Sequence, residues 1–233
     1  MTFHVLTLFP EMFPGTLKHS LAGKALGSKW ELKVYNIRDY SQDKHQNVDE
    51  KPFGGGAGMV MRPDVLGNAI ENIINEHVIE KQIYFTPRGK VMEQNYISHL
   101  TNFNSALLLC GRFEGIDQRI IDFYNFEEIS LGDFIMSGGE ISALALIDAC
   151  IRLLPGVINN QNALSEESFS SQNEFSGLLE YPLYTRPSEW NGLMVPEVLM
   201  SGNHKEIKNW RHDQAMKITK ERRSDLWSKY KES

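Results

Sequence analysis

Two glycine-rich segments contain residues that could bring the backbone close to a ligand. The first runs from Lys51 to Gly58 (KPFGGGAG) and the second from Leu131 to Glu140 (LGDFIMSGGE). Inside regular structure glycine costs about 0.5 to 1 kcal/mol relative to alanine, so such clusters are kept where a side chain would block a turn or a contact. Two tight turns are the simpler interpretation. The second segment, however, follows a predicted strand and precedes a predicted helix, which is where open α/β sheets bind ligands.

The sequence argues against two other kinds of site. Neither Gly-Lys-Ser nor Gly-Lys-Thr follows Gly58, and no helix is predicted to begin there, so a phosphate-binding loop of a nucleotide-hydrolysing enzyme is disfavoured. Cys110 and Cys150 form no C-x-x-C pair, and the sequence therefore predicts neither a zinc site nor a disulfide framework. Cys110 ends an apolar run and is interpreted as a buried small side chain.

Composition and the pattern of apolar residues indicate a cytoplasmic protein that does not enter a membrane. The chain has 233 residues, of which 41% are hydrophobic and 23% are charged, as is ordinary for a globular protein. Residues 1–10 lack the basic start and the small-residue cleavage site of a signal peptide. The longest apolar stretch, Ile141 to Leu154, contains Asp148 and Arg152 and is too short to span a bilayer.

Charge is distributed unevenly along the chain. The formal net charge is −6, yet residues 204–233 carry nine Lys and Arg residues against five Asp and Glu residues, a local charge of +4. A solvated helix face would have this composition, and so would a surface that binds a polyanion. Charge alone leaves the two interpretations open.

Periodicity and turn residues predict alternating strands and helices. Strands are expected at residues 3–8, 30–36, 82–85, 105–109 and 127–130, and helices at residues 11–26, 63–76, 93–100, 117–124, 140–154 and 204–220, with a last short helix capped by Ser224. Residues 37–61 are expected to form a long loop. This alternation predicts an α/β fold whose parallel sheet has helices on both faces.

The chain is predicted to contain two domains joined by a linker. Residues 1–157 form the α/β domain, and residues 158–176, which are rich in Asn, Ser, Gln and Glu, form a flexible interdomain linker. Residues 177–233 form a small helical domain. Its main helix begins after Asn203, a plausible N-cap with Glu206 three residues later, as in a capping box.

Seven segments of the sequence resemble one known family. They are LTLFPEMF (6–13), KPFGGGAGM (51–59), LCGRFEGID (109–117), ISLGDFIMSGGE (129–140), LLPGV (153–157), YTRP (184–187) and VPEVLMSGNH (195–204). In order and spacing they are similar to the bacterial tRNA (guanine-N1)-methyltransferases, which belong to the SPOUT family of knotted methyltransferases. The resemblance extends from residue 2 into the C-terminal helix.

The resemblance implies a fold, a reaction and partners. The fold would be a SPOUT-type parallel sheet with a deep trefoil knot in residues 1–157, and the protein would be a homodimer. The reaction would transfer a methyl group from S-adenosylmethionine to N1 of the guanine at position 37, immediately 3′ of the anticodon of tRNA. Residues 177–233 would bind the tRNA through phosphates, which agrees with the basic charge of the C-terminal helices.

The resemblance also implies which residues hold the cofactor. Three loops, at residues 86–90, 110–115 and 131–139, each follow a predicted strand and would together hold S-adenosylmethionine. The expected binding residues are Pro87, Gly111, Glu114, Leu131, Gly132, Asp133, Phe134, Ile135, Met136, Gly138 and Gly139. Any one of these loops alone would be interpreted as an ordinary strand-to-helix connection.

Two catalytic residues are implied in the same way. N1 of guanine carries a proton that a carboxylate can accept, and a cation near O6 can stabilise the developing negative charge. Arg152 occupies the family's arginine position, although an exposed or ion-paired arginine is the simpler interpretation of that helix. Glu167 stands where the family has aspartate, and Glu166 is the neighbouring alternative.

Two questions stay open at this point. Because Glu167 replaces the family's aspartate, a non-catalytic RNA-binding protein is the rival hypothesis. No metal site is predicted from spacing, but a magnesium ion is kept as an additional cofactor because Glu114, Asp133 and Glu167 could offer oxygen ligands.

Overall fold

The computed structural model describes residues 1–158, 164, 166–170 and 175–232. The chain divides into two compact units, unit 1 with residues 1–159 and unit 2 with residues 160–233. Much of the predicted linker, residues 158–176, lies outside the described residues, so the proposed domain boundaries stay a prediction.

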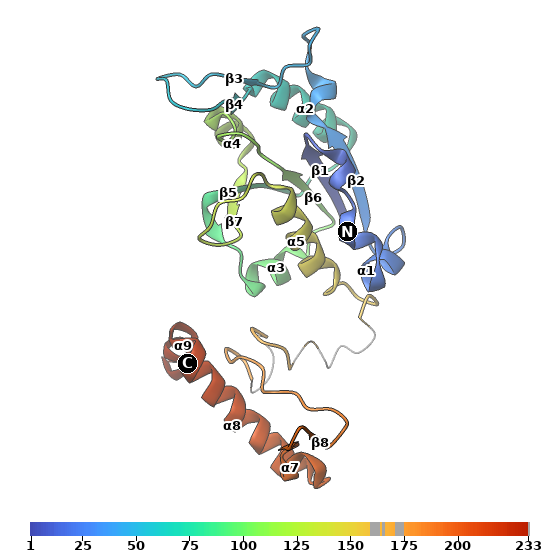
Figure 1. Ribbon diagram of the computed structural model, residues 1–233. Coiled ribbons are helices and arrows are strands. Elements are labelled where there is room, and N and C mark those ends of the chain that lie inside the picture. Colours follow the sequence, from blue (N-terminus) through green and yellow to red (C-terminus); the bar gives the residue numbers. More distant parts are fainter. Residues whose placement is uncertain (159–163, 165, 171–174, 233) are drawn as a thin grey trace. The chain divides into compact units, whose positions relative to one another are not determined.

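Unit 1 is built on a five-stranded parallel sheet with the strand order β2-β1-β6-β5-β7 (Figure 1). The strands are β1 (Thr2–Thr7), β2 (Glu31–Asn36), β5 (Lys81–Val91), β6 (Ser105–Leu109) and β7 (Glu127–Ser130). The helices are α1 (Ser20–Ala25), α2 (Pro63–Glu76), α3 (Gln94–Leu100), α4 (Gln118–Tyr124) and α5 (Glu140–Ile151). The predicted α/β class with a parallel sheet is therefore confirmed.

Helices cover both faces of this sheet because alternate strand residues point to opposite sides. In β6, Ala106 and Leu108 belong to one core cluster, which also contains side chains of α3 and α5. Leu107 and Leu109 belong to a second cluster, which contains side chains of α2 and α4. A strand buried on both faces in this way requires a continuous apolar run, as the sequence ALLL provides.

One predicted helix and two predicted element ends are wrong. Residues 11–26 form two short 3-10 helices, η1 (Pro10–Met12) and η2 (Gly15–Lys18), followed only then by α1. Pro14 has no N–H to donate, and Gly15 and Ser20 both have φ of 55°, which a continuous helix excludes. The helix predicted to reach residue 154 ends at Ile151, and the strand predicted for residues 82–85 continues to Val91 through a register shift.

The loop predicted for residues 37–61 contains short regular pieces. These are η3 (Ile37–Tyr40) and a two-stranded antiparallel ladder of β3 (Asp49–Glu50) and β4 (Val60–Met61). The glycine-rich segment Lys51–Gly58 forms the connection between those two strands. Strands of two residues give no periodicity that a sequence could display.

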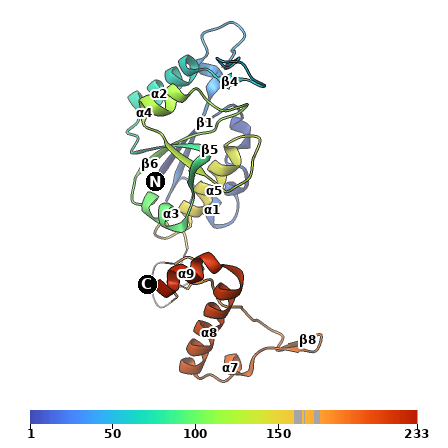
Figure 2. The ribbon, with the colours of Figure 1, turned by 90° about the vertical axis from the view of Figure 1, so that its left-hand side faces the viewer.

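Unit 2 is mainly helical, with one small hairpin (Figure 2). Its elements are β8 (Glu189–Trp190), β9 (Leu193–Met194), α7 (Glu197–Met200), α8 (His204–Arg222) and α9 (Ser224–Glu232). Asn203 caps α8, because its side-chain oxygen accepts a hydrogen bond from the Glu206 amide at 3.4 Å. The predicted cap and the predicted last helix are both confirmed.

A buried histidine lies in β1. His4 is 2% exposed, and its Nδ1 lies 3.1 Å from the hydroxyl of Tyr35, while its ring centroid lies 4.7 Å from that of His77. Burial, together with the charges of His77 and Lys33, lowers the pKa of His4 from 6.5 to about 4. Between about pH 6.5 and pH 4, His4 therefore binds a proton in the unfolded chain but stays mainly neutral in the folded chain.

We expect the free energy of unfolding to fall as the pH is lowered from about 6.5 to about 4, by at most about 1.4 kcal/mol per pH unit from this one group. His4→Gln should lose that part of the pH dependence while keeping a polar side chain near Tyr35. Urea unfolding of both proteins across this pH range measures the difference. If the free energies of unfolding of the two proteins changed in parallel with pH, His4 would titrate alike in the folded and unfolded states.

Candidate functional site

A cavity of about 260 Å³ lies in unit 1 at the carboxyl ends of β6 and β7 and beside the middle of β5. Three separate stretches of chain line it, residues 84–87, 111–115 and 129–139, and Ser142 of α5 closes it. Two of these stretches coincide with the loops predicted at residues 110–115 and 131–139. The prediction of a third loop at residues 86–90 is wrong, because these residues lie within β5, and of them only Thr86 and Pro87 line the cavity. The carboxyl ends of parallel strands meet at one edge of the sheet, which is why loops far apart in sequence converge there.

The structure brings together ten of the eleven predicted cofactor-binding residues. Pro87, Gly111, Glu114, Leu131, Gly132, Phe134, Ile135, Met136, Gly138 and Gly139 line the cavity. Asp133 is exposed and does not line it. The contacts of these residues with a cofactor stay a prediction.

Sequence reasoning missed several lining residues, of which Tyr84 is the largest. Tyr84 is 5% exposed, lies in the buried part of β5 and lines the cavity beside Gly111. A Cβ atom on Gly111 would lie 2.9 Å from Cε2 of the Tyr84 ring, so glycine is required for this close approach. The only sequence signal for Tyr84 is an aromatic residue at the carboxyl end of a predicted strand. Ser130 and Ser142 also line the cavity and gave no signal.

A buried ion pair joins the second and third loops. Arg112 Nη2 lies 2.9 Å from Glu140 Oε2, and Arg112 Nε donates a hydrogen bond to Glu140 Oε1 at 3.1 Å. The hydroxyl of Thr7 at the end of β1 donates to the same Oε1 at 2.8 Å. Glu140 is 1% exposed and is the first residue of α5, where the helix dipole favours a negative charge. Oε2 stands within ion-pair distance of Arg112 but accepts no well-aligned hydrogen bond from the described atoms.

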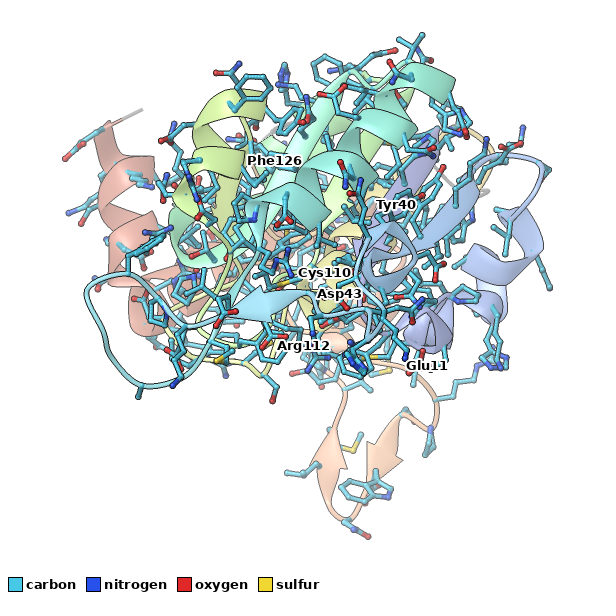
Figure 3. All side chains as sticks on the ribbon, turned by 90° about the horizontal axis from the view of Figure 1, so that it is seen from above. Glu11, Tyr40, Asp43, Cys110, Arg112 and Phe126 are labelled. Atoms are coloured by element: carbon cyan, nitrogen blue, oxygen red, sulfur yellow. The ribbon has the colours of Figure 1, made fainter. Side chains whose placement is uncertain are left out.

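Arg112 also contacts the chain segment that follows β1. Its guanidinium lies 4.4 Å from the centroid of the Phe9 ring, and Nη2 lies 3.7 Å from the sulfur of Met12. Nη1 donates to the carbonyl of Ser137 at 3.3 Å, within the third loop. Figure 3 labels Arg112 and Cys110, which directly follow β6. One side chain thus links three segments that are distant in the sequence.

This packing explains why Gly138 and Gly139, which precede Glu140, have no side chains. A Cβ on Gly138 would lie 2.4 Å from Arg112 Nε and 2.6 Å from Glu140 Oε2. A Cβ on Gly139 would lie 2.9 Å from the backbone Cα of Cys110, which cannot move aside as a flexible side chain can. These glycines therefore let the third loop lie against the second.

Cys110 lies in this region but is not suited to covalent chemistry. Its side chain is fully buried, and burial together with the nearby Glu140 carboxylate raises the pKa of the thiol well above its usual value. A thiol needs to ionise to act as a nucleophile. The interpretation of Cys110 as a buried small residue is confirmed.

The first glycine-rich segment is tied to the second loop by backbone hydrogen bonds. The Glu114 amide donates to the carbonyl of Met59 and the Met61 amide donates to the carbonyl of Gly115, both at 2.9 Å. A Cβ on Gly58, whose φ is 78°, would lie 2.5 Å from the Glu114 side chain. Between these fixed ends, Phe53 is fully exposed.

The two predicted catalytic residues lie in different units. Arg152 is the C-cap residue of α5 in unit 1, and Glu167 lies in unit 2. The structure does not bring them together within either unit, so their joint action stays a prediction.

The neighbouring acid, Glu166, has identified partners in unit 2. Its Oε2 accepts a hydrogen bond from the Tyr181 hydroxyl at 2.5 Å and from Arg211 Nη1 at 3.4 Å. Burial and the hydrogen bond with Glu166 raise the pKa of Tyr181 to about 12, so the phenol stays a donor at neutral pH. Burial, with the charges of Glu167 and Glu166, raises the pKa of Glu180. Glu166 therefore serves the packing of unit 2.

The described residues add no support for a metal centre or a membrane segment. Among them, no three His, Cys, Asp or Glu side chains converge as metal ligands. Of the three acids considered as magnesium ligands, Glu114 lines the cavity, Asp133 does not, and Glu167 belongs to unit 2. No helix in the described ranges is long and apolar enough to cross a bilayer.

Comparison with known proteins gives one consistent family. Residues 1–229 match the family described as "tRNA (Guanine-1)-methyltransferase TrmD". The chain is 56% identical over 229 residues to a tRNA (guanine-N(1)-)-methyltransferase of Wolbachia pipientis subsp. Culex pipiens, covering 97% of each chain. It is 51% identical to the protein of that name from Ehrlichia canis, covering 97% of this chain and 95% of the other, and 54% identical to the one from Rickettsia prowazekii, covering 95% of each.

We expect Glu140→Ala to lower the free energy of unfolding by about 3 to 5 kcal/mol, because it leaves the half-buried Arg112 charge without its carboxylate partner. Arg88→Ala is the matched control, because it removes an exposed ion pair. Arg88 Nη2 lies 3.2 Å from Glu128 Oε2, and the arginine side chain is 64% exposed. We expect this substitution to change the free energy of unfolding by less than about 1 kcal/mol. Urea unfolding followed by circular dichroism compares the variants. Equal effects of the two substitutions would show that the buried pair stabilises no more than a surface pair.

Proposed function

The chain belongs to the tRNA (guanine-1)-methyltransferase family, and on that basis we propose how its residues transfer a methyl group to N1 of guanine in tRNA. Membership of this family implies S-adenosylmethionine as the methyl donor. We propose guanine 37, immediately 3′ of the anticodon, as the acceptor. The match over residues 1–229, which includes all three cavity loops, is the observation that carries the proposal.

The cavity in unit 1 fits this donor. Its wall includes Gly111, Gly138 and Gly139, which have no side chains to occupy the space. Exposed backbone amides and carbonyls can hydrogen-bond an adenine edge and a ribose, while Pro87 and Tyr84 offer apolar surface. When bound, the donor supplies an electrophilic methyl group on a sulfonium. The ion pair of Arg112 with Glu140 holds the loops around it in one arrangement.

Proton removal from the acceptor is assigned to Glu167. The proton on N1 of guanine must leave for the lone pair to attack, and a carboxylate within hydrogen-bond reach can accept it. Glu166 is the neighbouring alternative, and its carboxylate accepts hydrogen bonds from Tyr181 and Arg211. Arg152 is proposed to stabilise the negative charge that develops on O6 as N1 loses its proton.

Because these two residues belong to different units, we further propose an assembly in which they meet. The family relation supports a homodimer in which one chain supplies the cavity and Arg152, while its partner supplies Glu167 and unit 2. It also supports a deep trefoil knot in residues 1–157, tRNA binding by residues 177–233 and action in the cytoplasm. A magnesium ion near Glu114 is kept as an additional hypothesis.

The basic test of the function is methyl transfer to unmodified tRNA transcripts. With labelled S-adenosylmethionine, transcripts with guanine at position 37 should be labelled and transcripts with adenine there should not. Binding of the guanine transcript without labelling would favour a non-catalytic RNA-binding protein.

If Glu167 is the general base, Glu167→Gln should slow methyl transfer by roughly 100-fold or more, because the amide cannot accept the proton but keeps the shape of the side chain. Glu167→Asp should retain most of the activity, since the carboxylate is kept. Glu166→Gln is the adjacent control and should have little effect on chemistry. Single-turnover methylation separates this step from product release. A normal rate for Glu167→Gln with an inactive Glu166→Gln would move the base to residue 166.

If the active site draws on two chains, mixing Arg152→Ala with Glu167→Ala should restore activity that neither variant has alone. Random exchange makes half of the dimers mixed, each with one complete site, so we expect up to roughly one quarter of the wild-type activity. Sedimentation of the wild type should give twice the chain mass of 26.6 kDa. A monomer, or a mixture as inactive as its components, would contradict the shared site.

A further inference from the structure

Unit 2 contains a second hollow, which the proposed function does not use. Its volume is about 950 Å³, and it lies between residues 181–188 and the helices α7 and α8. Its wall includes Leu183, Tyr184, Arg186, Met200, Trp210 and Arg211. The lining residues include two arginines and no acidic side chain.

One side of the hollow is aromatic and partly open to solvent. The rings of Tyr184 and Trp210 meet edge to face, with their centroids 6.1 Å apart and an interplanar angle of 61°. Tyr184 is 49% exposed, and Leu183 beside it is 72% exposed. An edge-to-face pair leaves a ring face free for a further flat partner.

Another side is formed by a stacked arginine. The guanidinium of Arg211 lies 4.8 Å from the centroid of the Tyr181 ring, and both residues line the hollow. Arg211 Nη1 contacts Glu166, whereas its Nε is buried and has no hydrogen-bond partner among the described atoms. Aromatic rings and guanidinium planes are the surfaces on which proteins stack unpaired RNA bases.

We propose that this hollow holds one unstacked nucleobase of the tRNA, different from the guanine that is methylated. The inference rests on the proposed function for the presence of tRNA. A base fits the wall because its flat face can stack on Tyr184 and its acceptor atoms can face Arg186 or Arg211. The excess of basic residues in 204–233, the segment that contains α8, favours RNA over an acidic or a purely apolar partner.

A base bound in this hollow would also affect the position of Glu166 and Glu167. Tyr181 and Arg211, which line the hollow, are the two residues that hold Glu166, and Glu167 is the next residue in the chain. A base seated against Tyr181 and Arg211 fixes the side chains that position this pair of acids. Capture of the second base thereby places Glu167 when tRNA is bound.

The test uses the full chain with Tyr184→Ala, wild-type tRNA transcripts and a series of transcripts with one abasic position each in the anticodon stem and loop. Tyr184→Ala should weaken tRNA binding at least about 5-fold, the lower end expected for loss of one base stack, and leave S-adenosylmethionine binding unchanged. One abasic position other than 37 should weaken binding to the wild type and have no further effect on Tyr184→Ala. Tyr184→Trp should retain the wild-type affinity.

Phe123→Ala is the matched control, because it removes an aromatic ring that is 74% exposed on α4 of unit 1 and should leave tRNA affinity unchanged. The proposal would be overturned if Tyr184→Ala and each abasic substitution weakened tRNA binding additively. It would also be overturned if the two effects were non-additive only at position 37. So would a Tyr184→Ala protein that binds tRNA normally but no longer dimerises, since the surface would then join two copies of the chain. The binding assay needs no turnover, so failure of methyl transfer by the wild type is recognised separately as failure of the proposed function.

Discussion

The ion pair between Arg112 and Glu140 is the contact on which the arrangement of the cavity depends. A carboxylate that is 1% exposed is costly to bury, and here it is tolerated because Arg112 and Thr7 both contact it and because it stands at the N-terminus of α5. The same arginine contacts Phe9, Met12 and the Ser137 carbonyl. The second and third loops and the segment that follows β1 are therefore fixed relative to one another by one buried ion pair, in addition to the sheet itself.

Close backbone packing is the second constraint, and it explains where glycine is indispensable. Gly138 lies against the ion pair, Gly139 against the backbone of Cys110, and Gly111 against the ring of Tyr84. Any larger residue at these places would push the loops apart or separate Arg112 from Glu140. The glycines thus serve two purposes: they allow the charge pair to form, and they leave the cavity between the loops unfilled at these positions.

Several elements were predictable from the sequence because one local signal determined each of them. The apolar stripe of α2 begins after Arg62 with Pro63 and ends at Glu76 as predicted, and Asp117 caps α4 through its side chain. The helix predicted for residues 11–26 failed because Pro14 and two residues of positive φ outweigh its apolar pattern. The ion pair could not be predicted, since Thr7, Arg112 and Glu140 meet only through the sheet topology. Most predicted site residues depended on the resemblance to a family, and Asp133 shows its limit: it lies within a lining segment but does not face the cavity.

The two adjacent acids of unit 2 are alternatives for one proposed role. Either Glu166 or Glu167 has the charge for proton transfer, and the resemblance to the family prefers Glu167 by its position. The carboxylate of Glu166 is held by the phenol of Tyr181 and the guanidinium of Arg211. Its contacts fix the backbone from which the next side chain extends, and glutamate at 167 reaches one methylene further than the aspartate of the resembled family. Under the proposed function, Tyr181 and Arg211, which line the hollow of unit 2, would therefore help to place that longer carboxylate through Glu166.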